Sequence, residues 1–356
     1  MSYLLDAAER GTLPDRFIRW GIRLLDYRRL HTERRPNPTA ELEAKQAFLS
    51  AMRAAPIAVV PEMANRQHYE VPPEFFQLVL GRNLKYSGCL WPAGVERLDA
   101  AEEAMLALTC ERAELADGME ILELGCGWGS LSLWMAQRYP KSRILAVSNS
   151  APQRRFITAA AAERGLANIE VLTADMNGFD TGRRFDRAVS VEMFEHLRNW
   201  PRLLENIHRW LTPGGRLFIH IFTHRRYAYL FETEGDDNWM GRHFFSGGIM
   251  PSDDLPLRFQ EDLRLLRRDR WNGRHYQRTA NAWLDNMDRR RDAILPIMAA
   301  TYGDDHGEQW FQRWRIFFMA CAELFGLEEG REWYVAHYLF ARREDAAGAV
   351  DGDARS

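Results

Sequence analysis

The sequence lacks several features that would assign it to a specialised class of protein. Its 356 residues include only four cysteines, which show neither the paired spacing of a zinc site nor the density of a secreted disulfide scaffold. Lys and Arg number 47 against 50 Asp and Glu, so no strong positive field attracts nucleic acid. No apolar run approaches the roughly 20 residues that span a bilayer, and the N-terminus lacks the order of a signal peptide. We therefore expect a soluble, cytoplasmic protein without a metal site or a nucleic-acid partner.

The first 115 residues have the apolar spacing of helices, both around residues 17–25 and around residues 75–79. We expect residues 1–115 to form a helical layer added to a catalytic domain. Seven arginines between positions 16 and 35 make the beginning of this layer basic. A solvated helix face is the favoured interpretation, and contact with an anionic membrane surface is the alternative.

From Met119 onward, short apolar runs alternate with helical patterns, which is typical of βαβ units around a parallel sheet. Strands are expected at residues 121–124, 143–148, 169–173, 188–192 and 216–221. The predicted fold class is therefore α/β, with a doubly wound, Rossmann-like sheet in residues 116–344.

The alternation stops after Phe222. An aromatic segment rich in Asp and Gly follows, and we expect residues 223–258 to be a lid or substrate-binding insertion after the fifth strand. A strand at 263–271, helices at 280–299 and 308–325, and a closing strand at 333–342 are expected next. The small, charged tail at 345–356 is predicted to be disordered.

Three glycines, Gly125, Gly127 and Gly129, lie between the first strand and a helix predicted to begin near Ser130. Such a loop turns tightly and lets its backbone approach a ligand at a helix N-terminus. The dinucleotide fingerprint G-x-G-x-x-G would need its third glycine at Ser130, and here the spacing is G-x-G-x-G. This departure favours S-adenosylmethionine (SAM), with S-adenosylhomocysteine (SAH) as product, over a nicotinamide cofactor. The predicted sheet is thus that of a class I SAM methyltransferase.

The ends of the second and third strands supply further candidates for the donor site. Ser148, Asn149 and Gln153 are candidates to hydrogen-bond the ribose in place of the usual carboxylate, although Ser and Asn also cap helices. Asp175 is a candidate to accept from the adenine amine, and Met176 to pack on the ring. A simple turn residue is an equally favoured interpretation of Asp175. Val191, on the fourth strand, is also assigned to the donor site.

The fourth strand leads into Glu192, Glu195 and His196, at the sheet edge where open α/β folds carry their chemistry. If the chain turns helical here, the three residues share one face at positions i, i+3 and i+4. Two carboxylates beside an imidazole provide a proton acceptor and a site lining that tolerates a positively charged substrate. In isolation an acidic helix start would be the simpler interpretation, but the position after a strand favours a site.

Several motifs resemble the cyclopropane-fatty-acid synthase superfamily of SAM enzymes, over most of the chain from about Gln67. They are Tyr86-Ser87, residues 125–129, Ser148-Asn149-Ser150 with Gln153, Glu195-His196, and His275-Tyr276 with Thr279 and Trp283. Within that superfamily, three further segments are most similar to the plant coclaurine-type N-methyltransferases of benzylisoquinoline alkaloids. These are residues 192–196, the segment from Asp236-Asp237 to Ser252, and residues 321–326 with 333–337.

The resemblance implies that Glu192, Glu195 and His196 hold an amine and help to remove its proton, and it places Tyr86 and Ser87 in the donor site. That help is needed because an alkylamine has a pKa of roughly 10 and only the free amine can attack the methyl group. A dry cavity favours this reaction. Five aromatic residues are candidates for lining it, although each is more often plain core: Phe244, Phe245, Trp271, Trp283 and Phe325.

The main alternative is a lipid cyclopropane synthase or fatty-acyl methyltransferase. The resemblance implies that such an enzyme uses bicarbonate held by groups matching Glu195, His220 and Tyr276, and all three are present. One departure weakens this alternative, because Gly88 stands where many members have Cys. A SAM-binding regulator without turnover is disfavoured by the retained acidic and imidazole groups. The expected partner is therefore a small-molecule amine or a lipid acyl chain, and a homodimer is left open.

Overall fold

The computed structural model describes residues 2–59, 71–235 and 238–345. Gln67, the pair Asp236-Asp237 and the predicted disordered tail beyond residue 345 lie outside the described residues.

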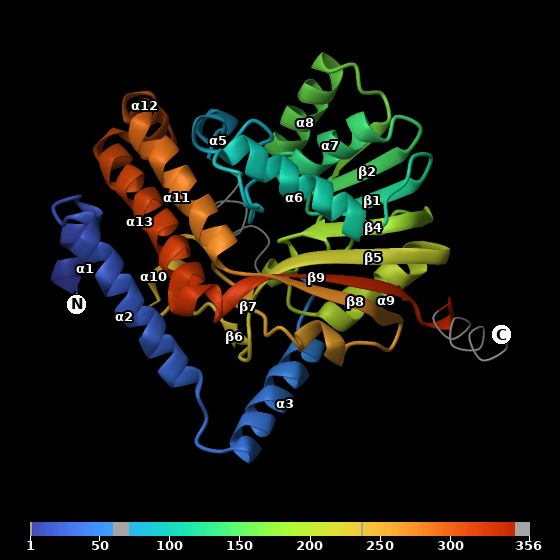
Figure 1. The fold of residues 1–356 in the computed structure, drawn as a ribbon, viewed down its shortest axis with the longest axis horizontal. Coiled ribbons are helices and arrows are strands. Elements are labelled where there is room, and N and C mark those ends of the chain that lie inside the picture. The colour runs from blue at the N-terminus through green and yellow to red at the C-terminus, as the bar shows by residue number, and fades with distance from the viewer. Residues whose placement is uncertain (1, 60–70, 236–237, 346–356) are drawn as a thin grey trace.

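A seven-stranded sheet forms the centre of the described chain (Figure 1). Its strand order is β3-β2-β1-β4-β5-β9-β8, in which β1 to β5 are parallel and β9 is antiparallel to both of its neighbours. The strands are β1 (Glu120–Leu124), β2 (Arg143–Ser148), β3 (Ile169–Thr173), β4 (Phe185–Val191), β5 (Leu211–His224), β8 (Leu263–Trp271) and β9 (Trp333–Arg342). The predicted doubly wound α/β sheet is confirmed.

The strand boundaries test the sequence prediction closely. The predicted ranges of β2, β3, β8 and β9 agree with the structure residue for residue. The predicted start of β5 at Arg216 is wrong, because β5 begins at Leu211 and includes the pair Gly214-Gly215. The pairing of β5 with β4 shifts register across this pair, so the glycines lie in a bulge rather than before the strand.

Helices cover both faces of the sheet because successive strand residues point to opposite sides. On β1, Ile121 packs with residues of α6 (Leu98–Arg112) and α7 (Ser130–Arg138). The next residue, Leu122, packs with residues of α9 (Trp200–Trp210) on the other face. α8 (Ala151–Glu163) lies on the same face as α7, and α3 (Pro38–Ala54) lies against α9.

Two of the sheet helices begin at side-chain caps that the sequence contains. The Ser150 hydroxyl accepts a hydrogen bond from the Gln153 N–H at the start of α8. The Asn199 side chain accepts from the Arg202 N–H at the start of α9. A proline follows in the first turn of each helix, where its missing N–H costs nothing.

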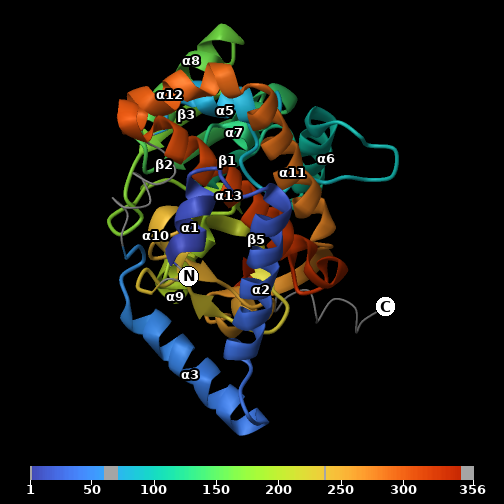
Figure 2. The same cartoon turned by 90° about the vertical axis from the view of Figure 1, so that its left-hand side faces the viewer.

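A second helical body lies beside the sheet, as Figures 1 and 2 both show. It consists of α11 (Arg274–Arg289), α12 (Arg291–Tyr302) and α13 (Gly307–Gly326), joined by α1 (Ser2–Glu9), α2 (Asp15–Glu33) and α5 (Pro73–Val79). The single helix predicted at 280–299 is wrong, because the chain breaks at Arg290 into α11 and α12. The predicted N-terminal layer is helical but divided, since α1 and α2 pack on α13 whereas α3 packs on α9.

The basic face of α2 is partly explained by this packing. Arg19 and Arg23 both form ion pairs with Glu323 of α13, at 2.7 and 2.5 Å. Within the described residues, no helix is both long and apolar enough to cross a membrane.

The predicted lid contains short elements rather than a plain loop. They are β6 (Tyr229–Leu230), α10 (Trp239–His243), β7 (Ile249–Met250) and the 3-10 turn η2 (Leu255–Arg258). β6 pairs with β7 to form a small hairpin beside the main sheet. The remaining 3-10 turns are η1 (Phe194–His196), η3 (Asp304–His306) and η4 (Leu327–Gly330).

Candidate functional site

A cavity of about 730 Å³, which we call the donor cavity, lies at the carboxyl ends of β1, β2 and β4. Seven of the eleven predicted donor-site residues line it: Gly125, Gly127, Ser148, Asn149, Gln153, Asp175 and Met176. The cavity therefore lies at the sheet edge that the glycine loop predicted.

Gly127 and Gly129 have different roles in the loop. Both have left-handed backbone angles, with φ of 53° and 82°. A Cβ at Gly127 would meet no atom within 4 Å, so the backbone there faces open cavity space. A Cβ at Gly129 would lie 2.6 Å from Ile157 of α8, and Gly129 does not line the cavity. In this structure Gly129 therefore allows the loop to pack closely against α8, and its contact with the ligand stays a prediction.

Gln153 offers a hydrogen-bond donor to a ligand. The Ser148 hydroxyl accepts from the Ser150 N–H and donates to Gln153 Oε1 at 2.6 Å, which fixes the orientation of the amide. The amide nitrogen, Nε2, is buried and has no hydrogen-bond partner among the described residues. A buried unpaired donor is costly, so it fits a ligand that brings hydroxyl or carboxylate oxygens, as SAM does.

Asp175 combines the two interpretations that the sequence left open. It lines the donor cavity, and its carboxylate also accepts from the backbone and side chain of Asn177, at 3.0 and 3.3 Å, as in an Asx turn.

Three predicted donor residues lie elsewhere. Tyr86 lines the neighbouring cavity described below. Ser87 is buried and accepts a hydrogen bond from Lys85 Nζ. Val191 packs in the apolar cluster beneath α6 and α7. None of the three lines the donor cavity, and their contact with SAM stays a prediction.

A second cavity of about 760 Å³, which we call the acceptor cavity, is lined mainly by aromatic and other apolar side chains. Its lining residues are Tyr86, Glu192, His196, Phe222, Phe231, Met240, Phe245, Met250, Tyr276, Trp283, Phe317, Cys321, Leu324 and Phe325. Four of them, Phe231, Met240, Phe245 and Met250, come from the predicted lid. Glu192 and His196 line both cavities, so the two cavities meet at these side chains.

The aromatic candidates divide into two groups. Phe245, Trp283 and Phe325 line the acceptor cavity as predicted. Phe244 instead stacks on Phe317 in the core, with ring centroids 4.5 Å apart. Trp271 is hydrogen-bonded to His337 and does not line the cavity.

Glu192 does not lie on a helix with Glu195 and His196, so the predicted shared helix face is wrong. Its φ is +47°, and the 3-10 turn η1 begins only at Phe194. The carboxylate of Glu192 accepts three hydrogen bonds, from the Gly88 N–H at 2.9 Å, the Tyr276 hydroxyl at 2.7 Å and His220 Nε2 at 3.2 Å. The predicted residues Tyr276 and His220 thus meet on Glu192.

Glu195 lines neither cavity. Its Oε1 accepts from the Phe222 N–H of β5 at 2.7 Å, and its Oε2 has no hydrogen-bond partner among the described residues. Burial, together with the nearby charge of Glu192, raises the pKa of Glu195 well above its ordinary value. Glu195 therefore joins the η1 turn to β5 through this hydrogen bond, and its contact with the acceptor stays a prediction.

Electrostatics separates the two groups at the junction. Burial raises the pKa of Glu192, while the Lys85 charge and the hydrogen bonds from Gly88 and Tyr276 oppose that rise. Burial lowers the pKa of His196 to about 4, so its imidazole is neutral at pH 7. The junction therefore presents the carboxyl group of Glu192, held by three hydrogen bonds, and the neutral ring of His196, whose centroid lies 4.4 Å from that of Phe245.

Sequence reasoning missed Lys85 and His337. Lys85 is buried, and its ammonium donates to Ser87 Oγ and to the Gly88 carbonyl at 2.8 Å, in the loop that contacts Glu192. His337 Nε2 lies 3.0 Å from His220 Nδ1. The signals were weak: a Lys directly before the Tyr-Ser pair, and a His within an otherwise apolar buried strand.

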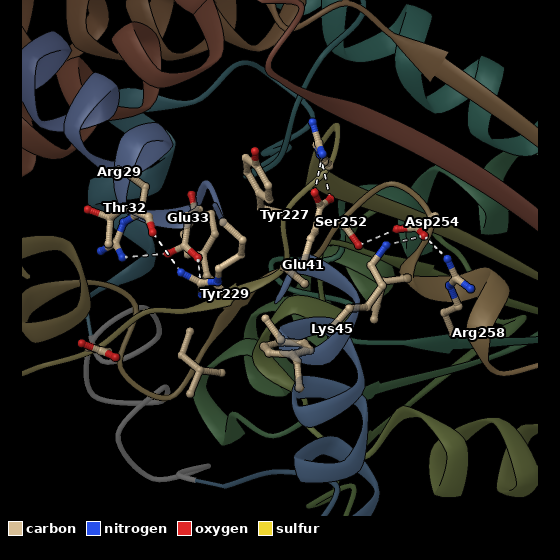
Figure 3. Close-up of a pocket in the computed structure, with 18 residues that line it drawn as sticks. Arg29, Thr32, Glu33, Glu41, Lys45, Tyr227, Tyr229, Ser252, Asp254 and Arg258 are labelled. Carbon is tan, nitrogen blue, oxygen red and sulfur yellow. Dashed lines mark hydrogen bonds and ion pairs between the residues drawn. The ribbon is translucent and has the colours of Figure 1, made fainter. Parts of the chain in front are cut away.

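A larger cavity of about 1100 Å³ lies between α2, α3 and the β6 hairpin (Figure 3). None of the predicted site residues lines it. Its charged side chains pair with one another: Lys45 and Arg258 both bind Asp254, at 2.7 and 2.6 Å, and Arg226 binds Glu41. It is therefore separate from the site described above.

Comparison with known proteins gives four findings. Residues 60–332 match a family model described as mycolic acid cyclopropane synthetase. An (S)-coclaurine N-methyltransferase from Thalictrum flavum subsp. glaucum is 36% identical over 344 residues, which cover 96% of this chain and 95% of that protein. The cyclopropane-fatty-acyl-phospholipid synthase of Escherichia coli (strain K12) is 29% identical and is matched over 77% of this chain and 67% of that protein. A crystal structure of coclaurine N-methyltransferase bound to N-methylheliamine and SAH matches with a TM-score of 0.91 at 35% identity, over 95% of this chain and 99% of that one.

Proposed function

This chain belongs to the mycolic acid cyclopropane synthetase family and is a SAM-dependent methyltransferase, and we propose that it methylates the nitrogen of a small, largely apolar amine. The resemblance found in the sequence is thereby confirmed at the level of the family. The relative that covers nearly all of this chain is named an N-methyltransferase, and the named lipid enzyme is matched over a smaller share.

The observation that carries the proposal is the position of the Glu192 carboxylate. Under the lipid alternative, His220 and Tyr276 would help to hold bicarbonate. Here the same two side chains and the Gly88 N–H donate to the carboxylate of Glu192. The site thus holds a carboxylate of the protein itself at the position where the lipid alternative needs free bicarbonate. Gly88 supports this arrangement, because a Cβ there would lie 3.1 Å from both Tyr276 and Val335.

A fixed carboxylate beside an apolar cavity suits an amine better than an alkene. Glu192 supplies a negative charge that attracts an ammonium ion, and the acceptor cavity is otherwise mainly apolar. At pH 7 an alkylamine with a pKa of roughly 10 is about 99.9% protonated, which corresponds to about 4 kcal/mol against the reactive free base. The burial that raises the pKa of Glu192 makes it a stronger base than a surface carboxylate.

The residues then have distinct roles in the reaction. Gly127, Ser148, Gln153 and Asp175 would hold SAM, which would supply an electrophilic methyl group on a sulfonium ion. Glu192 pairs with the ammonium and accepts its proton, a transfer that removes both charges from the apolar cavity. His196, neutral at the junction, accepts a hydrogen bond from the amine and orients its lone pair.

Aromatic rings favour the charged product. Methylation turns the neutral amine back into an ammonium ion, and the aromatic side chains of Trp283 and Phe325 line the cavity in which it forms. Cation–π attraction is strongest where water is excluded.

A labelling experiment tests this function. Purified protein is incubated with methyl-labelled SAM and either a panel of primary and secondary aryl-alkyl amines or vesicles of unsaturated phospholipid. We expect label in the amine fraction, with the methyl group on nitrogen by mass spectrometry. Label found in the lipid alone would refute the amine assignment and support the bicarbonate-dependent alternative.

A further inference from the structure

We propose that Trp271, His337 and His220 form a directed chain of hydrogen bonds that holds the Glu192 carboxylate in place and cannot conduct a proton away from it. The proposal rests on the function proposed above, in which Glu192 is the proton acceptor. Trp271 and His337 touch neither cavity. They therefore act through His220 and Glu192, as positioning residues.

The three side chains come from the three neighbouring antiparallel strands β5, β9 and β8. His220 and His337 are directly opposite each other in the β5–β9 pairing, and Trp271 is opposite Val335 in the β9–β8 pairing. Trp271 Nε1 lies 3.1 Å from His337 Nδ1, His337 Nε2 lies 3.0 Å from His220 Nδ1, and His220 Nε2 lies 3.2 Å from Glu192 Oε1. Both histidines are almost completely buried, so water does not compete for these bonds.

The chain has only one consistent direction. An indole N–H can donate but cannot accept, so Trp271 makes His337 Nδ1 an acceptor. Burial keeps the pKa of both histidines well below its ordinary value, so each ring is neutral and carries one N–H. The proton of His337 is therefore on Nε2, where it donates to His220 Nδ1. The proton of His220 is then also on Nε2, where it donates to Glu192.

This direction has a chemical consequence. A relay would require each member to accept a proton on one side while it releases one on the other. Trp271, at the far end, cannot take up a proton from His337, so the proton accepted by Glu192 does not leave by this route. It leaves through the cavity junction, where Glu192 and His196 are accessible from both cavities. The chain instead keeps one carboxylate oxygen pointing at His220 while Gly88 and Tyr276 bind the same group.

The tautomers can be measured without any substrate. Full-length protein labelled with 15N-histidine is examined by long-range 1H–15N NMR, which separates protonated from bare ring nitrogens, with His220→Gln and His337→Gln used to assign the signals. We expect the Nε2–H tautomer at both residues. In Trp271→Phe, His337 Nδ1 loses its hydrogen-bond donor while Glu192 still fixes the direction from the other end, so we expect the 15N signal of His337 Nδ1 to shift and both rings to keep the Nε2–H tautomer. Trp210→Phe is the matched control, because it removes an indole bond of 3.0 Å to Asp180, outside the site, and should leave both signals unchanged.

Kinetics provides the second readout. Trp271→Phe and His337→Phe should each lower kcat by about tenfold, the size of one lost hydrogen bond, while leaving SAM affinity unchanged. His337→Gln, which keeps an acceptor oxygen and a donor N–H, should recover most of the loss. Wild-type protein with Nδ1–H at either histidine, or Trp271→Phe turnover equal to wild type, would overturn the proposal. If the wild-type enzyme methylates no amine, the proposed function fails instead, and the NMR result still decides the direction of the chain.

Discussion

Replacement of Glu192 by Gln tests how much of the acceptor site depends on one negative charge. The amide keeps the size of the carboxylate, its oxygen can still accept from the Gly88 N–H and His220, and its nitrogen can donate to the Tyr276 oxygen. The three contacts that hold the side chain therefore survive, and the variant should fold normally. What disappears is the charge that attracts the ammonium and the base that accepts its proton.

The expected loss follows from Coulomb's law. Two opposite unit charges at about 4 Å attract by about 4 kcal/mol in an effective dielectric of about 20, so kcat/KM for the amine should fall by about 10³-fold at pH 7. The deficit should shrink as the pH rises from about 7 to about 9.5, because a growing fraction of the amine is already neutral.

Initial rates with labelled SAM at both pH values, together with SAH binding by calorimetry, test this estimate. SAH affinity should be close to that of the wild type, because the other residues that line the donor cavity are untouched. A Glu192→Gln variant within threefold of wild type at pH 7, or one whose deficit does not change with pH, would refute the assigned role of Glu192.

Four other perturbations probe separate parts of the site and the core. Glu192→Gly should accommodate the φ of +47° and leave an empty position between Gly88, His220 and Tyr276. Added acetate or bicarbonate should bind there and restore part of the lost activity. Activity that does not change with either anion would contradict the anion-binding geometry. Glu195→Gln should retain turnover, because the amide mimics a protonated acid and still accepts a hydrogen bond from the Phe222 N–H. Glu195→Ala should lose turnover while its SAM affinity is unchanged. Equal activities of the two variants would argue against the role of Glu195 in joining η1 to β5. Gln153→Ala should weaken SAH binding by about tenfold in calorimetry while kcat at saturating SAM stays constant, and unchanged binding would remove Gln153 from the donor site. Burial raises the pKa of Glu123 from 4.5 to about 8, so between these pH values the folded state holds a proton that the unfolded state has lost, and the stability of the wild type falls as the pH rises. Measured by urea unfolding, the stability of Glu123→Gln relative to wild type should therefore increase by about 1.4 kcal/mol per pH unit, or about 4 kcal/mol from pH 5 to pH 8. A difference that does not change with pH would show that Glu123 is ionised in the folded state.

The local sequence pattern was sufficient to predict an element whose ends are marked by turn or cap residues. β8 runs from Leu263 to Trp271 and is followed by Asn272-Gly273, which end it as turn residues do. α8 and α9 likewise begin at a polar cap followed by proline, which is a local signal in the sequence. The donor cavity could be predicted for the same reason, since its glycine loop and its strand ends are each short segments with their own local signal.

The acceptor site was harder to predict because its geometry comes from distant segments. Local pattern suggested that Glu192 begins a helix, yet its partners Gly88, His220 and Tyr276 lie 104, 28 and 84 residues away. These contacts accompany a left-handed backbone angle that no local propensity favours for Glu. Lys85 and His337 were missed because a single buried polar residue gives no signal until its partners are known.

The most direct test of the central claim is a crystal structure of the protein with SAH and an N-methylated amine. We expect the SAH sulfur in the donor cavity and the amine nitrogen in the acceptor cavity, directed at each other across the junction and within reach of Glu192 and His196. An amine nitrogen turned away from Glu192, or SAH bound outside the cavity lined by Gly127 and Gln153, would contradict the account.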